Sequence, residues 1–192
     1  MKSRADCCSE VIPPITTLRV LGNESIAENI HRIVLNGSLD ARPGQFAMLW
    51  IPGFGEKPFS IASRDPLEFI VEAIGDFSAE LCRLRASELL SFRGPLGRGY
   101  SLSARNPLLL GGGCGAAPLF FLAREFLEMK REPTTVLGAR SLRSLISSLT
   151  WPGRLELCTD DGSLGYHGSA VDCAASVLRE EDFDGLYRSE EH

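Results

Sequence analysis

The sequence passes from an apolar run into a glycine-rich turn at Leu108-Leu109-Leu110-Gly111-Gly112-Gly113-Cys114-Gly115-Ala116-Ala117-Pro118-Leu119. The leucines predict a buried strand, and Pro118 suits the first turn of a helix, where its missing N–H costs nothing. Glycines at such a junction let backbone amides approach a phosphate group, so the turn is a candidate dinucleotide site. Close packing of the strand against the helix explains the same glycines, and the turn alone does not decide between these interpretations.

The residues after this turn alternate between strand and helix patterns, which is typical of a parallel sheet with crossover helices. The predicted strands cover 108–110, 134–138, 154–158 and 185–188, and the predicted helices cover 118–130, 142–149 and 169–179. We therefore expect a small, doubly wound, four-stranded parallel α/β domain over residues 105–192.

The residues before the turn show short apolar runs separated by turn residues, the rhythm of an antiparallel barrel. Strands are predicted at 15–21, 30–35, 46–51, 59–62, 67–74 and 89–92, with turns at 22–24 and 36–37. Ser78 is the predicted N-cap of a short helix. The expected fold class is thus β + α/β: an N-terminal antiparallel six-stranded β-barrel over residues 1–104, followed by the α/β domain.

Composition and charge narrow the class of protein. The 192 residues have a net charge of -5 and are 44% hydrophobic, which is typical of a soluble globular protein and argues against nucleic acid or an anionic membrane as the main partner. No apolar run approaches the roughly 20 residues of a membrane span, and no secretory signal is apparent, so a cytoplasmic location is expected. The six cysteines form no CxxC pair, so we expect reduced thiols and no metal site.

A cation, an aromatic ring and a hydroxyl lie together in Lys57-Pro58-Phe59-Ser60. Such a group suits a flavin nucleotide: the cation would pair with a phosphate, the ring would lie along the flavin, and the hydroxyl would bond to the flavin edge. An edge strand begun by proline, with a solvated lysine, is the simpler interpretation of the same residues.

A second candidate phosphate site is Gly75-Asp76-Phe77-Ser78, at the predicted start of a short helix. A helix N-terminus favours an anion. A simple N-cap explains the same residues, and Asp76 places a negative charge where an anion would bind.

The order of these segments resembles the ferredoxin reductase superfamily of flavin and pyridine-nucleotide enzymes, and within it the electron transfer subunits of dihydroorotate dehydrogenase. The resemblance covers nearly the whole chain from residue 15 onward. It is carried by Pro43-Gly44-Gln45-Phe46, Lys57-Pro58-Phe59-Ser60-Ile61, Gly75-Asp76-Phe77-Ser78, Gly94-Pro95-Leu96-Gly97, the segment 111–119 and the segment 161–168.

The resemblance implies two cofactors, FAD on the barrel and NAD(H) on the α/β domain. Hydride transfer needs stacked rings more than a titrating side chain, so no catalytic acid or base is assigned. Arg140 is equally well explained as a solvated cation. The implied cofactor-binding residues are Lys57, Pro58, Phe59, Ser60, Ile70, Val71, Glu72, Phe77 and Ser78 for FAD, and Gly112, Gly113, Cys114, Gly115, Arg140 and Asp160 for NAD(H).

The chain departs from the family pattern at three places. Lys57 stands where the family usually has arginine, and Glu72 stands where it often has a cation, so weaker flavin binding is expected. The sequence also lacks the family's C-terminal cysteine-rich loop, so no iron–sulfur cluster is expected from this chain.

The resemblance implies an oxidoreductase subunit that passes electrons between FAD and NAD(H). Its expected partner is a dihydroorotate dehydrogenase catalytic subunit, in pyrimidine biosynthesis. Two alternatives stay open: a stand-alone NAD(P)H:flavin oxidoreductase, and a cofactor-binding protein without turnover. Arg140 also leaves NADP open as the dinucleotide.

Overall fold

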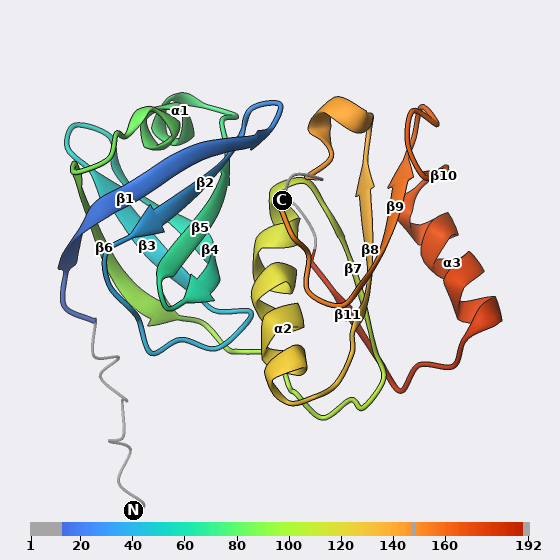
Figure 1. The fold of residues 1–192 in the computed structure, drawn as a ribbon. Helices are drawn as coiled ribbons and strands as arrows, with labels where there is room; N and C mark the ends of the chain where they lie inside the picture. The colour runs from blue at the N-terminus through green and yellow to red at the C-terminus, as the bar shows by residue number, and fades with distance from the viewer. Residues whose placement is uncertain (1–12, 147–148, 190–192) are drawn as a thin grey trace, which may run out of the picture.

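The computed structural model describes residues 13–146 and 149–189, which form two units side by side (Figure 1). The first is a closed barrel with strand order β1-β2-β5-β4-β3-β6, and the second is a five-stranded sheet with order β10-β9-β8-β7-β11. The predicted fold class is confirmed. Cys7 and Cys8 lie outside the described residues.

The barrel is antiparallel throughout and filled with apolar side chains. Leu49, Ile61 and Phe69 are each 0% exposed inside it. All six predicted strands are present, two with the predicted bounds (β2 and β3), whereas β1, β4 and β6 are longer and β5 is shorter. The elements are β1 (Thr16–Ala27), β2 (Ile30–Leu35), β3 (Phe46–Ile51), β4 (Gly55–Arg64), β5 (Leu67–Glu72), α1 (Asp76–Arg83) and β6 (Leu89–Leu96).

The turn predicted at 22–24 is wrong, because β1 continues through it to Ala27. The side-chain amide of Asn23 donates hydrogen bonds to the carbonyl oxygens of Leu81, Cys82 and Leu84, at 3.1, 3.1 and 2.8 Å. These carbonyls lie at the C-terminal end of α1, where the helix leaves carbonyls without an intrahelical donor, and the Leu81 carbonyl also accepts from the Leu84 N–H at 3.2 Å. Asn23 is therefore a cap supplied from a distant strand.

Asn23→Ala is expected to lower the free energy of unfolding by about 1–2 kcal/mol, because three carbonyls at the end of α1 lose the hydrogen bonds that the Asn23 amide donates to them. Urea denaturation followed by circular dichroism measures this change. The control is Asn36→Ala at an exposed turn, expected within about 0.5 kcal/mol of the parent protein. Equal effects of the two substitutions would contradict the capping role.

The prediction that Ser78 is the N-cap of α1 is wrong. The helix begins at Asp76 with Gly75 as N-cap, and Ser78 lies in the first turn. The Ser78 hydroxyl accepts hydrogen bonds from the backbone N–H groups of Ile74 and Gly75, at 3.0 and 3.1 Å, and donates one to the Gly75 carbonyl at 3.1 Å. Ser78 thus fastens the start of the helix from inside its first turn.

The second unit is a parallel sheet with α2 and α3 on opposite faces (Figure 1). Its strands are β7 (Pro107–Gly112), β8 (Thr134–Ala139), β9 (Arg154–Thr159), β10 (Tyr166–His167) and β11 (Gly185–Arg188), and its helices are α2 (Ala116–Glu128) and α3 (Ala170–Glu180). Ser169 caps α3 by accepting a hydrogen bond from the Asp172 N–H.

Two predictions for this unit are wrong. The sheet has five strands rather than four, since the two-residue strand β10 is too short to give a pattern. In place of the helix predicted at 142–149, the described residues of that segment contain only the 3-10 turn η2 (Leu142–Ser144).

Helix α2 lies between the barrel and the sheet (Figure 1). Its buried Leu119 and Phe120 share one apolar cluster with Ile30 and Ile70 of the barrel. The tip of the β1–β2 hairpin reaches the sheet unit, because the Glu28 N–H donates to the Arg143 carbonyl at 2.8 Å. A common core and a backbone hydrogen bond therefore hold the two units together.

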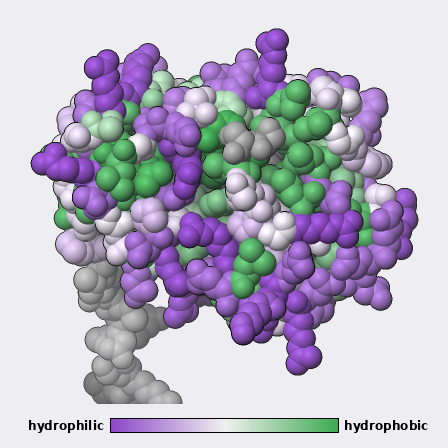
Figure 2. Space-filling view, viewed as in Figure 1, coloured by the Kyte–Doolittle hydropathy of each residue, from purple (hydrophilic) through white to green (hydrophobic). Residues whose placement is uncertain are grey.

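The surface is largely hydrophilic in the view of Figure 2, with apolar side chains gathered over the barrel and near its junction with the sheet. In residues 13–146 and 149–189, no helix has the length and apolar character that crossing a lipid bilayer requires.

Candidate functional site

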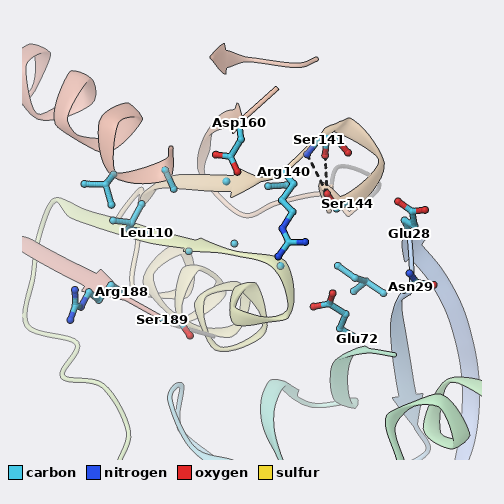
Figure 3. A pocket seen from close by; sticks show the side chains of 18 residues that line it. Glu28, Asn29, Glu72, Leu110, Arg140, Ser141, Ser144, Asp160, Arg188 and Ser189 are labelled. Atoms are coloured by element: carbon cyan, nitrogen blue, oxygen red, sulfur yellow. Dashed lines mark hydrogen bonds between the residues drawn. The ribbon is translucent and has the colours of Figure 1, made fainter. Parts of the chain in front are cut away.

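A cleft of about 670 Å³ opens between the barrel and the carboxyl ends of the parallel strands (Figure 3). In the sheet order, β8 and β9 lie on one side of β7 and β11 lies on the other, so the winding direction reverses at β7. Ligands of such sheets bind at the point of reversal. The lining residues are Glu28, Asn29, Ile30 and Glu72 from the barrel, and Leu110, Gly111, Gly112, Gly113, Gly138, Ala139, Arg140, Ser141, Ser144, Asp160, Ala170, Val171, Arg188 and Ser189 from the sheet unit.

The glycine-rich turn forms the floor of this cleft. Glycine is required at positions 111, 112 and 113 for different structural reasons. A Cβ on Gly111 would lie 2.6 Å from a Leu119 methyl, and a Cβ on Gly112 would lie 2.4 Å from the Gly138 carbonyl oxygen. Gly113 has a φ of 48°, which favours glycine. Packing thus explains two of the glycines, and yet the turn faces the cleft as a phosphate site requires.

Arg140 extends from the end of β8 into the cleft, toward the side where Glu72 lies (Figure 3). Within the part of the chain that the structure describes, its guanidinium has no hydrogen bond or ion pair. Glu28, Glu72 and Asp160 bring negative charge to the same cleft, and Arg188 brings a second positive charge. Arg140 is therefore a cation that can pair with an anionic ligand.

Five of the residues predicted for cofactor binding meet in this cleft: Glu72, Gly112, Gly113, Arg140 and Asp160. Cys114 and Gly115 are not among its lining residues. They follow in the short 3-10 turn η1 (Gly113–Gly115), where Cys114 is half-buried and Gly115 is buried.

Six other predicted residues lie outside the cleft, on β4 and α1 of the barrel unit: Lys57, Pro58, Phe59, Ser60, Phe77 and Ser78. The rings of Phe59 on β4 and Phe77 on α1 are stacked, with centroids 5.9 Å apart and an interplanar angle of 17°. On the same strand, Lys57 is exposed, Pro58 is exposed and Ser60 is half-buried. Within the described residues, neither the Lys57 amine nor the Ser60 hydroxyl has a hydrogen-bond partner, so both are available to a ligand.

Ile70 and Val71 are core residues, 3% and 0% exposed. Ile70 packs in the cluster shared with α2, and Val71 packs inside the barrel. Their side chains have no free surface for a cofactor, so only the backbone of this segment can face one.

Sequence reasoning missed several residues of the cleft: Glu28, Asn29, Ser141, Ser144, Ala170, Val171, Arg188 and Ser189. A signal existed for the last two, because 185–188 was predicted as a parallel strand and the carboxyl ends of such strands meet at one edge. No signal existed for Glu28 and Asn29, since their place depends on how the barrel packs against the sheet.

The structure gives no group of three or more His, Cys, Asp or Glu side chains suited to a metal ion within residues 13–146 and 149–189. The cysteines of these residues, Cys82, Cys114, Cys158 and Cys173, are free thiols. Burial raises the pKa of Cys82 to about 11 and that of Cys158 to about 12, which keeps both thiols protonated at neutral pH.

Comparison with known proteins finds no protein-family model that matches the chain. Among solved structures, an NADH-dependent reduced ferredoxin-NADP oxidoreductase is 28% identical, with a TM-score of 0.80 over 90% of this chain and 67% of that one. The ferredoxin reductase of carbazole 1,9a-dioxygenase, at 20% identity and a TM-score of 0.73, shares the fold.

Two curated relatives are more similar in sequence, and both are described as probable dihydroorotate dehydrogenase B (NAD(+)), electron transfer subunit. The protein of Methanocaldococcus jannaschii is 37% identical over 174 residues, which cover 90% of this chain and 66% of the relative. That of Thermococcus kodakarensis is 35% identical over 164 residues, covering 84% and 69%. The chain spans about two thirds of the length of these relatives. Because such identity extends over both the barrel and the sheet unit, the chain belongs to the family of dihydroorotate dehydrogenase B electron transfer subunits.

Proposed function

We propose that this chain moves electrons between FAD and NAD(H), as an electron transfer subunit that works with a dihydroorotate dehydrogenase catalytic subunit in pyrimidine biosynthesis. The description of the relatives assigns electron transfer and NAD(+) to them. A cytoplasmic location is part of the proposal.

The observation that carries the proposal is that one cleft is lined by both units. Glu72 of β5 lies on the barrel side, and Gly112 and Gly113 lie on the sheet side. Strand β4, with Lys57 and Ser60, is the neighbour of β5 in the barrel. A ligand on β4 and a ligand in the cleft therefore occupy adjoining sites.

We assign the flavin to the barrel, residues 1–104, and the dinucleotide to residues 105–192. Lys57 fits a phosphate as a point charge, and the free hydroxyl of Ser60 fits a polar atom at the flavin edge. Arg140 fits a phosphate of the dinucleotide, beside the backbone of the glycine turn. When bound, the two cofactors supply hydride and electron chemistry, and the protein supplies their orientation.

The test is anaerobic reduction of the FAD-loaded protein by NADH, with NADPH in parallel. NADH is expected to bleach the visible band of the oxidised flavin. Arg140→Ala is expected to raise the NADH concentration for half-maximal rate about tenfold, because a charge-assisted contact to phosphate is lost. Flavin that binds but is reduced by neither dinucleotide would identify a cofactor-binding protein without turnover and contradict the proposal.

The partner is tested separately. The purified chain is mixed with the dihydroorotate dehydrogenase catalytic subunit of the same organism and analysed by gel filtration, where co-elution is expected. Dihydroorotate should then reduce NAD(+) only in the mixture. Reduction of free flavin by the chain alone, with no co-elution, would favour a stand-alone flavin oxidoreductase.

A further inference from the structure

The end of β8 is the part of the cleft where the adenosine ribose of a dinucleotide belongs. In doubly wound sheets the pyrophosphate lies at the turn after the first strand, and a carboxylate at the end of the second strand binds the 2′-hydroxyl of that ribose. Here β7 is the first strand, and β8, its neighbour in the sheet, is the second. The segment 139–146, where β8 ends, contains no aspartate or glutamate. The second strand therefore supplies no carboxylate to the ribose.

A carboxylate reaches this part of the cleft from the barrel instead. Glu28, at the tip of the β1–β2 hairpin, lines the cleft on the side of Ser144 (Figure 3). The Glu28 N–H donates to the Arg143 carbonyl of the sheet unit at 2.8 Å, and the Asn29 carbonyl accepts from the Ala73 N–H of the barrel at 2.8 Å. Backbone hydrogen bonds to both units thus hold Glu28 beside the end of β8.

Two carboxylates of the cleft are available to a ligand. Within the described residues, the side chains of Glu28 and Asp160 have no hydrogen bond or ion pair. The third carboxylate, Glu72, is engaged in another interaction. A free carboxylate accepts hydrogen bonds from the hydroxyls of a ribose, and it repels a phosphate in the same place.

Three arginines bear on the same ligand. Arg140, Arg143 and Arg188 are exposed, as Glu28 and Asp160 are, so water and salt screen all five charges alike. Arg140 extends toward the barrel side of the cleft, where it fits the pyrophosphate (Figure 3). Arg143 is not among the lining residues, and Arg188 belongs to β11, which β7 separates from β8. A phosphate on the 2′-oxygen of the ribose would therefore lie near Glu28 while Arg140 is occupied.

We propose that Glu28 determines which dinucleotide this chain binds. Its carboxylate accepts a hydrogen bond from the 2′-hydroxyl of the adenosine ribose of NAD(H) and repels the 2′-phosphate of NADP(H). The barrel unit then takes part in recognising the dinucleotide as well as the flavin. This inference rests on the proposed dinucleotide site and names the residue that sets its selectivity.

Calorimetric titration of the full chain with NAD(+) and with NADP(+) tests the proposal by binding alone, since neither oxidised dinucleotide reduces a flavin. The dissociation constant of NADP(+) is expected to exceed that of NAD(+) at least about tenfold. Glu28→Gln keeps a hydrogen-bond acceptor and removes the charge, and it is expected to lower this ratio about tenfold. Glu132→Gln, the same change at an exposed position outside the cleft, is the matched control and should leave the ratio unchanged.

The outcomes separate this proposal from the proposed function. A parent protein that binds NADP(+) as tightly as NAD(+) would overturn the proposal and assign Arg140 to the 2′-phosphate. A ratio in Glu28→Gln equal to that of the parent would also overturn it, because the selectivity would then come from the sheet unit. If neither dinucleotide binds the parent, the proposed function itself fails. Circular dichroism of each variant confirms that it is folded.

Discussion

Gly112→Ala is expected to lower the free energy of unfolding by about 2 kcal/mol and to weaken NADH binding at least about tenfold. The added Cβ would lie 2.4 Å from the Gly138 carbonyl oxygen, closer than real Cβ contacts come. Gly112 and Gly138 are paired in register at the ends of β7 and β8, so the clash is between two backbones. No side-chain rotation relieves it, and the strands must separate where the cleft has its floor.

The matched control is Gly22→Ala in β1, where a Cβ would have no atom within 4 Å. That substitution is expected to be neutral or slightly stabilising, because alanine loses less conformational freedom on folding than glycine. Urea denaturation gives the stability change, and calorimetric titration with NADH gives the binding change. A Gly112→Ala protein with the parent's unfolding midpoint would refute the close approach of β7 and β8.

Local patterns were enough to predict most elements of the fold. The leucines of 108–110 and the glycines after them specify a strand, a turn and a helix within a dozen residues, and the structure confirms all three. The strands 30–35 and 46–51 have their predicted bounds because turn residues flank them. Where neighbouring residues in the sequence make the contacts, the sequence carries the signal.

The errors occur where distant contacts override local preference. Asn23 belongs to a turn-like triplet, yet its amide bonds to carbonyls at the end of α1 and the strand runs on. Ser78 has the preference of an N-cap but bonds to groups that precede the helix. Strand β10 exists only because β9 offers it an edge. In each case the deciding partner lies outside the window that a pattern covers.

One side of the candidate site could likewise be predicted from the sequence and the other could not. The sheet side of the cleft follows from the rule that carboxyl ends of parallel strands meet, which places Gly112, Arg140 and Asp160 together. The barrel side depends on the packing of two units against each other. Glu28 reaches the cleft because the hairpin tip bonds to Arg143, a contact that no sequence pattern specifies.

Glu68→Met is expected to destabilise the protein by about 3 kcal/mol, since it breaks an ion pair in which one partner is buried. The Glu68 side chain is 2% exposed and the Arg32 side chain is 28% exposed. Two hydrogen bonds join them, Arg32 Nε to Glu68 Oε2 at 2.9 Å and Arg32 Nη2 to Glu68 Oε1 at 2.6 Å. Glu68 shares a face of β5 with Ile70, which packs in the cluster that joins the barrel to α2.

The double variant Arg32→Met/Glu68→Met separates the loss of attraction from the cost of an unpaired charge. Removing Glu68 alone leaves a partly buried guanidinium without its partner, whereas removing both leaves apolar side chains of similar size, expected to cost only about 1 kcal/mol. Glu156→Met, from the exposed pair with Arg154, is the surface control and should cost less than about 1 kcal/mol. Denaturation in urea measures all three. If the double variant loses as much free energy of unfolding as Glu68→Met, the attraction within the pair itself stabilises the protein. If Glu68→Met loses no more than the surface control, the buried ion pair does not contribute to stability.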